Sequence, residues 1–169
     1  APEPVLGRFR VELPESVSVP STSANSVALS RDGTRIAILG EKDGHSAIYV
    51  RRMDDPVSQV VRGTEGALYP GFSPDGRSLV FAVASSLVKV PVTGGTPQKL
   101  ADFADNFVAS WGDGETILYT VQGALWRVSS DGANRTLVAR PDSSRGILRY
   151  LQPHMLPGGR YALVTQEAR

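Results

Sequence analysis

Residues 72–81 read Phe72-Ser73-Pro74-Asp75-Gly76-Arg77-Ser78-Leu79-Val80-Phe81, and variants of this phrase recur along the 169-residue chain. The variants occupy residues 29–38, 110–119 and 155–164. A repeat of roughly 40 residues indicates an array of similar units rather than one irregular fold. In this alignment the equivalent positions of the four copies are Asp32, Asp75, Asp113 and Gly158.

Each unit carries the same order of turn and strand signals, which the second unit shows most clearly. Its Asp-Gly pair favours a hairpin turn, because both residues tolerate positive φ. An apolar, β-branched run follows at residues 78–83, then a turn, then a third run at 87–90. A Gly-rich turn leads to a short fourth run at residues 98–100. Four short strands joined by tight turns are typical of one blade of a β-propeller.

These signals predict an all-β fold, a partial β-propeller of four-stranded antiparallel blades with almost no helix. A β-sandwich also uses short strands and turns, but it does not explain a turn that returns at a regular interval. The predicted division is an N-terminal strand and linker in residues 1–24, blade 1 in 25–67, blade 2 in 68–106, blade 3 in 107–149 and a truncated blade 4 in 150–169.

The N-terminal part and the number of units lead to further expectations. Alternating polarity predicts a half-buried strand at residues 9–13, and a serine-rich loop is predicted at 16–24. Propellers close with about 4–8 blades, so three blades and the start of a fourth predict an open ring. We expect the chain to be a piece of a longer protein, or several copies to complete a ring. Unpaired edges on the terminal blades predict self-association.

Composition excludes several classes of function. The chain has 18 basic and 17 acidic residues, and a net charge of +1 argues against a nucleic-acid partner, which requires a concentrated basic face. It contains no cysteine, which excludes disulfides, cysteine–zinc sites and thiol catalysis. No apolar run approaches the roughly 20 residues of a membrane-spanning helix, so we predict no membrane insertion by this segment.

The phrase at residues 72–77 resembles the repeat of WD40-like propellers of the TolB type, and the resemblance covers about residues 25–169. The same repeat occurs in the propellers of prolyl-oligopeptidase-like enzymes and in many bacterial surface proteins. The resemblance therefore implies the architecture and not a particular function.

A narrower resemblance is carried by residues 8–15, 27–33, 48–51, 63–67, 89–95 and 110–112. These segments resemble the C-terminal propeller of bacterial eukaryotic-like serine/threonine kinases. The resemblance implies a cytoplasmic kinase domain, a membrane helix and then this propeller outside the membrane as a sensor. The chain itself contains no Gly-rich phosphate loop, His-Arg-Asp catalytic loop or Asp-Phe-Gly motif. Three positions depart from the repeat, with Arg31 and Gly112 where proline is usual and Gly158 where aspartate is usual.

Two histidines are the first candidates for chemistry. His45 lies in Gly44-His45-Ser46-Ala47, which lacks the second glycine of a nucleophile elbow, so no catalytic site is predicted there. His154 occupies the place of Gly71 in the repeat, just before the turn. That place predicts that His154 faces the central channel, either as a ligand contact or as a structural residue.

Two tryptophans and the repeated aspartates complete the candidates. Trp126 takes the place of Val88, and Trp111 lies one place beyond that of Phe72. Packing between blades is the default for both tryptophans, whereas an exposed Trp126 would suit carbohydrate stacking. A calcium loop needs several oxygens within about a dozen residues, and the turn aspartates are far more widely spaced, so no metal site is predicted.

Taken together, the sequence predicts a non-catalytic binding or scaffolding module without a cofactor. The leading hypothesis is the extracytoplasmic sensor part of a bacterial serine/threonine kinase, in the periplasm or at the cell surface. The alternatives are a substrate-gating propeller of a prolyl-oligopeptidase-like serine peptidase and a stand-alone TolB-like envelope protein. The expected partner is a protein, a peptide or a small molecule.

Overall fold

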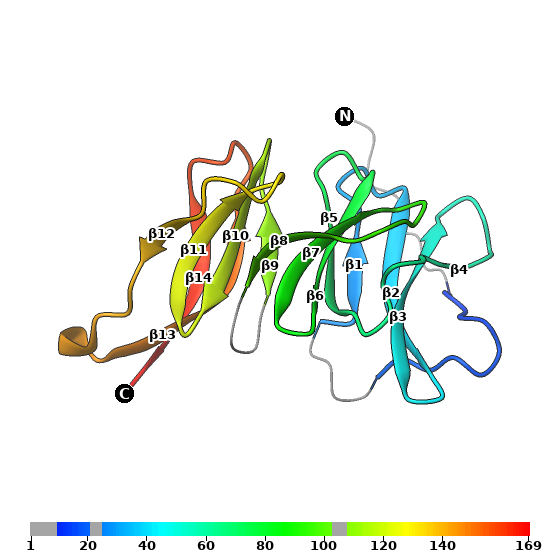
Figure 1. Cartoon of the computed structure of the whole chain (residues 1–169), viewed down its shortest axis with the longest axis horizontal. Helices are drawn as coiled ribbons and strands as arrows, with labels where there is room; N and C mark the ends of the chain where they lie inside the picture. The colour runs from blue at the N-terminus through cyan, green and yellow to red at the C-terminus, as the bar shows by residue number, and fades with distance from the viewer. Residues whose placement is uncertain (1–9, 21–24, 103–107) are drawn as a thin grey trace, which may run out of the picture.

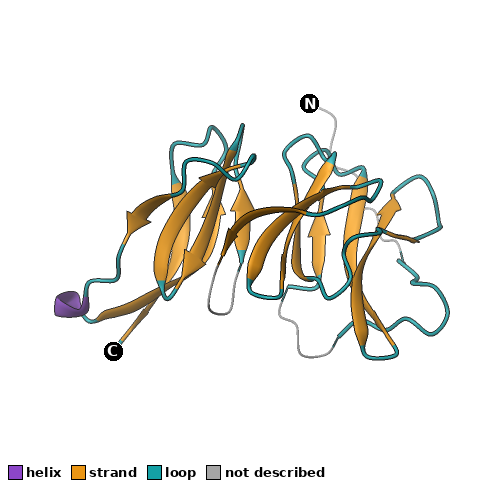
Figure 2. Ribbon diagram, in the orientation of Figure 1, coloured by secondary structure: helices purple, strands orange, loops and turns teal. Residues whose placement is uncertain are grey.

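The computed structural model describes residues 10–20, 25–102 and 108–169, which form an almost entirely β structure (Figure 1, Figure 2). In these residues, three four-stranded antiparallel sheets are followed by a two-stranded sheet, and each sheet uses strands that are consecutive in sequence. The helical part of the described chain is one 3-10 turn, Ser143–Arg145. These observations confirm the predicted all-β partial propeller with three complete blades and the start of a fourth.

Within each blade the strands follow one another in sequence order, from the innermost strand at the axis of the molecule to the outermost. Blade 1 contains β1 (Val27–Leu29), β2 (Arg35–Lys42), β3 (His45–Arg52) and β4 (Gln59–Val60). Blade 2 contains β5 (Leu68–Phe72), β6 (Ser78–Val83), β7 (Ser86–Pro91) and β8 (Gln98–Asp102). Blade 3 contains β9 (Ala109–Trp111), β10 (Thr116–Val121), β11 (Ala124–Ser129) and β12 (Thr136–Ala139), and blade 4 contains β13 (Ile147–Met155) and β14 (Ala162–Ala168). The inner strands β1, β5, β9 and β13 are neighbours in that order, so all four blades meet at a common axis.

Strand β6 of the middle blade shows how the sequence builds the core. Side chains alternate across a strand, so each strand presents two faces. Leu79 and Phe81 belong to a cluster shared with blade 1, whereas Val80 and Ala82 belong to a cluster shared with blade 3. All four side chains are at most 2 % exposed. Because both faces are buried, β6 is a continuous apolar run, and burial of each large side chain stabilises the stack by about 1.5–3 kcal/mol.

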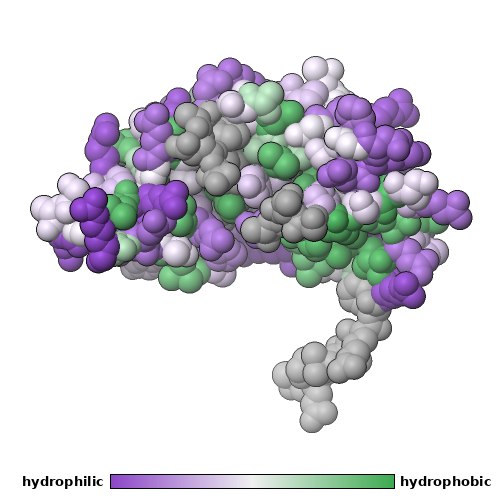
Figure 3. Space-filling view, turned by 90° about the horizontal axis from the view of Figure 1, so that it is seen from below, coloured by the Kyte–Doolittle hydropathy of each residue, from purple (hydrophilic) through white to green (hydrophobic). Residues whose placement is uncertain are grey.

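Large apolar side chains remain exposed on the two terminal blades, which each have a neighbour on one side within the described chain. Figure 3 shows hydrophobic side chains gathered on the blade 1 half of the face turned to the viewer. On blade 1 the exposed residues include Val27, Val57 and Val60, and around blade 4 they include Leu148, Tyr161 and Leu163. The terminal blades therefore bury less apolar surface than blade 2 does.

The predicted strand at residues 9–13 is wrong for the part that the structure describes, because residues 10–13 form no strand. The carbonyl groups of Arg10 and Glu12 accept hydrogen bonds from the side chains of Arg51 and Ser58, and not from the backbone of a neighbouring strand. Residues 1–9 and 21–24 of the predicted N-terminal strand and linker, and 103–107 at the boundary of blades 2 and 3, lie outside the described residues.

A serine and an aspartate hold the repeated turn in blades 1 and 2. In blade 2, Ser73 Oγ donates to Asp75 Oδ1 over 2.6 Å and accepts from Ser78 N over 2.9 Å. In blade 1, Ser30 Oγ likewise donates to Asp32 Oδ1 over 2.7 Å and accepts from a backbone N–H. The glycine that follows each aspartate has a positive φ, which its missing Cβ allows.

The same hydrogen bonds lower the pKa of both aspartates. Donation by the Ser30 hydroxyl is the largest cause for Asp32, and donors on Thr34 add to it, so the pKa of Asp32 falls to about 2. Donation by the Ser73 hydroxyl is the largest cause of the lowered pKa of Asp75. Each carboxylate is therefore held by hydrogen bonds within its own turn.

The third turn is one residue shorter than the first two, which corrects the predicted alignment. Trp111 pairs with Ile117 just as Phe72 pairs with Leu79. Trp111 therefore takes the place of Phe72 itself, and the prediction that it lies one place beyond is wrong. Aligning the sequences on their Asp-Gly pairs concealed the missing residue.

The missing residue also changes what holds the third turn. Gly112 N donates to Thr116 O, as Ser73 N donates to Ser78 O, so Gly112 stands where the turns of blades 1 and 2 have serine. No hydroxyl is available at this place to hold Asp113. The carboxylate of Asp113 is consequently free to make contacts outside its own turn.

Candidate functional site

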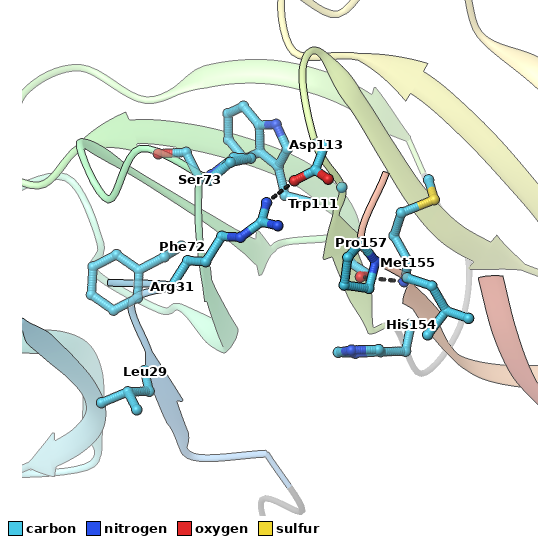
Figure 4. Close-up of a pocket in the computed structure, with 13 residues that line it drawn as sticks. Leu29, Arg31, Phe72, Ser73, Trp111, Asp113, His154, Met155 and Pro157 are labelled. Atoms are coloured by element: carbon cyan, nitrogen blue, oxygen red, sulfur yellow. Dashed lines mark hydrogen bonds and ion pairs between the residues drawn. The ribbon is translucent and has the colours of Figure 1, made fainter. Parts of the chain in front are cut away.

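A pocket of about 260 Å³ lies at the axis, where the inner strands of all four blades run into the repeated turns (Figure 4). Its first set of lining side chains comes from the last residue of each inner strand. Each member pairs with a residue near the start of the second strand of its blade. The members are Leu29, Phe72, Trp111 and Met155. This repeated position therefore gives the pocket an apolar wall with two aromatic rings.

A second repeated position lies inside the turn, two residues beyond the end of each inner strand. Its members are Arg31, Pro74, Asp113 and Pro157, and all four line the pocket. Proline at this position in blades 2 and 4 alternates with residues of opposite charge in blades 1 and 3. The departure of Arg31 from the usual proline thus has a structural counterpart in Asp113.

Arg31 and Asp113 form an ion pair across the pocket, which links blades 1 and 3 over the turn of blade 2. Figure 4 shows the Arg31 side chain extended from the blade 1 turn toward Asp113. The other carboxylate oxygen, Asp113 Oδ2, accepts a hydrogen bond from Gly158 N of blade 4 over 2.5 Å. The carboxylate therefore joins the turns of three blades. Sequence reasoning missed this pair, because the opposite charges fall at equivalent places of the two repeats only when the shorter third turn is taken into account.

His154 lies on β13 and lines the same pocket. It pairs with Leu163 as Gly71 pairs with Val80, so its place in the repeat is that of Gly71. Its imidazole is exposed, and Figure 4 shows the ring pointing from its strand into the centre of the view. Among the described residues, no hydrogen bond to the ring is found, so the imidazole is available to a ligand.

Trp126 lies away from the axial pocket, so the structure does not bring the two predicted site residues together. The indole is half-buried on β11 and packs against the cluster between blades 2 and 3. The Arg135 guanidinium lies 4.6 Å from the centre of the Trp126 ring and 6.0 Å from that of Tyr119. Cation–π contact of this kind covers one ring face that a sugar would use.

Trp111 is the tryptophan that reaches the axis. Its indole Nε1 donates to Gly114 O over 3.1 Å, which fixes the ring beside the turn of its own blade. Lys89 Nζ lies 5.9 Å from the centre of the ring and donates to Ser130 O. The ring is therefore held from two sides and presents a fixed apolar surface to the pocket.

The described residues contain neither a metal-ligand cluster nor a membrane-spanning helix. Within residues 10–20, 25–102 and 108–169, no group of three or more His, Asp or Glu side chains is placed to hold a metal ion. Across that same part of the chain, every helix is too short or too polar to cross a membrane. In the part of the chain that the structure describes, all four blades contribute side chains of different chemistry to the axial pocket.

Comparison with known proteins identifies the class of fold. No protein-family model and no curated protein matches the chain. Solved structures do match: a protein assigned as TolB from Agrobacterium tumefaciens superposes with a TM-score of 0.65 and 22 % identity, over 84 % of this chain and 53 % of that one. TolB from Acinetobacter baumannii also gives a TM-score of 0.65, with 16 % identity, over 85 % of this chain and 40 % of that one.

An oligogalacturonate lyase in complex with manganese is similar to the same extent, with a TM-score of 0.65 and 13 % identity over 84 % of this chain and 45 % of that one. The chain therefore has a TolB-like β-propeller fold. It spans about half the length of the solved structures that it matches.

Proposed function

We propose that the chain is a non-catalytic interaction module that recognises a protein, peptide or small molecule at its axial pocket. One observation carries the proposal: every blade contributes the same two repeated positions to a single pocket. The turns keep a common geometry while the side chains at these positions differ from blade to blade. Such an arrangement suits recognition, in which a fixed scaffold presents variable groups.

The hydrogen bonds made by the polar groups of the pocket support a non-catalytic role. Ser73 Oγ donates a hydrogen bond to Asp75, and Ser110 Oγ accepts a hydrogen bond from Met155 N over 2.9 Å. Nucleophilic catalysis needs a hydroxyl within hydrogen-bond reach of a base. Among the described residues, no hydrogen bond joins either serine to His154, which is the only imidazole lining the pocket.

We further propose that the module is the extracytoplasmic sensor part of a bacterial serine/threonine kinase. The support is the narrow sequence resemblance described above, together with a fold like that of TolB. Mass spectrometry of the natural gene product tests the assignment. Kinase peptides N-terminal to this segment are the expected result. A hydrolase domain after it, or a product with neither, would overturn the kinase assignment in favour of a peptidase or a stand-alone envelope protein.

Recognition at the axial pocket is tested by two-dimensional NMR on the full ¹⁵N-labelled chain with a mixed library of fragments and short peptides. We expect chemical-shift changes in the turns around the axis for at least one ligand, and we expect Trp111→Ala to remove them. Val57→Ala is the control, because Val57 is exposed on blade 1 and does not line the pocket. Changes that survive in Trp111→Ala, or no binding by any ligand, would contradict the proposal.

A further inference from the structure

Two polar side chains of the axial pocket, Arg31 and His154, have hydrogen-bond donors to offer a ligand. Asp113 is its one carboxylate, and both of its oxygens already have partners, Arg31 and Gly158 N. The Arg31 guanidinium carries five N–H donors. Its one contact found among the described residues is the ion pair through Nη1, and its side chain is 54 % exposed. The pocket therefore presents the remaining donors of Arg31 to whatever enters it.

His154 is the second polar side chain that offers a hydrogen-bond donor to the pocket. The exposed His154 imidazole supplies at least one further N–H donor from blade 4. Around these donors the walls are apolar, with Phe72 and Trp111 as the two rings. At about 260 Å³ the pocket lies just below the roughly 300–1,000 Å³ of cavities that hold drug-sized ligands, so it suits one anchoring group.

We propose that the pocket binds a carboxylate attached to an aromatic or aliphatic group. This inference rests on the proposed recognition function and specifies its ligand class. The free edge of the Arg31 guanidinium donates to the carboxylate, and the fork of an arginine matches a carboxylate in two parallel hydrogen bonds. Phe72 and Trp111 contact the apolar part of the ligand. A cationic ligand is disfavoured, since the one carboxylate of the pocket is already paired with Arg31.

Calorimetry on the full chain tests the ligand class with a matched pair of probes, N-acetyl-phenylalanine and its C-terminal amide. The two differ in charge and keep the same ring. Hydrogen bonds to a charged group predict that the acid binds about ten- to hundred-fold more tightly than the amide. A third probe, a short amidated peptide with one internal aspartate and a neighbouring phenylalanine, shows whether a side-chain carboxylate serves as well as a C-terminal one.

Two variants with opposite expected effects separate recognition from a merely structural role. Arg31→Gln should remove the preference for the acid and leave the affinity for the amide within about two-fold. Asp113→Asn removes the competing charge but keeps an oxygen for Gly158 N, so we expect it to bind the acid about two- to ten-fold more tightly. Arg160→Gln is the control for net charge, because Arg160 does not line the pocket. Circular dichroism checks that each variant is folded.

The outcomes distinguish this inference from the proposed function on which it rests. Equal affinity for the acid and the amide, or a weaker complex with Asp113→Asn, would overturn carboxylate recognition and leave the pocket as a binding site. Failure of both probes, while a fragment of another class binds at the axis, would overturn it as well. Failure of every ligand at the axis would overturn both proposals.

Discussion

Replacing Ser73 by alanine tests the account of the repeated turn. Ser73 is 4 % exposed, and its hydroxyl joins the two sides of the blade 2 turn. The substitution removes the bond donated to Asp75 and the bond accepted from Ser78 N. A neutral hydrogen bond contributes about 0.5–1.5 kcal/mol, and water replaces the contact to the exposed Asp75 carboxylate in part. We therefore expect Ser73→Ala to lower the free energy of unfolding by about 1–3 kcal/mol.

The assay has two independent readings. Urea titration followed by tryptophan fluorescence reports the free energy of unfolding through the half-buried Trp111 and Trp126. NMR titration of the side-chain carboxyl reports the pKa of Asp75, which should rise toward its ordinary value once the Ser73 hydroxyl is gone. Ser86→Ala is the matched control, because Ser86 makes a long, 3.5 Å contact with an exposed aspartate.

Neither the free energy of unfolding nor the pKa of Asp75 is decisive alone, since a destabilised turn can have several causes. The reasoning is refuted if Ser73→Ala changes stability by less than about 0.5 kcal/mol and leaves the pKa of Asp75 where it was. A loss of stability without a change in that pKa would show that packing of the serine, and not its hydroxyl, supports the turn.

Phe81→Ala should lower the free energy of unfolding by about 3–5 kcal/mol in the same urea assay, because the ring is fully buried between blades 1 and 2; a loss below about 1 kcal/mol would contradict that burial. Because the folded-state pKa of Asp32 is about 2 and lies below its unfolded value, its carboxylate stabilises the fold above about pH 4, and this contribution should be lost as the pH falls toward 2. Thermal melts of Asp32→Asn should therefore lack part of the acid destabilisation of the parent, and identical pH profiles would count against it. Within the described chain β14 pairs on one side alone and Leu163 is 60 % exposed, so we expect the chain to self-associate in sedimentation velocity and Leu163→Lys to weaken this association; a parent that stays monomeric at every concentration would refute it.

The blades were predictable because their signals are local. A turn residue that tolerates positive φ lies next to an apolar run, and both act over a few residues of chain. The strand expected at residues 9–13 failed for the opposite reason. Alternating polarity describes the two faces of a segment but does not show whether a neighbouring backbone edge is available to pair with it.

The pocket was predictable in part. The place of His154 follows from counting within the repeat, and the structure puts the residue at the axis. The ion pair of Arg31 and Asp113 did not follow, because it joins residues far apart in sequence and the shortened third turn hid their equivalence. Arg135 lies over the Trp126 ring, and no local pattern encodes that position.

Within each turn some residues hold the backbone and others face the axis, and this separation affects how the sequence of such a chain can evolve. Ser30, Asp32 and their counterparts in blade 2 keep the turn in shape, while Arg31 and Pro74 face the axis from between them. A substitution at an axial position therefore leaves the hydrogen bonds of its turn intact. New ligand preferences become accessible through single replacements, and duplication of a blade adds another such position without a new fold having to arise.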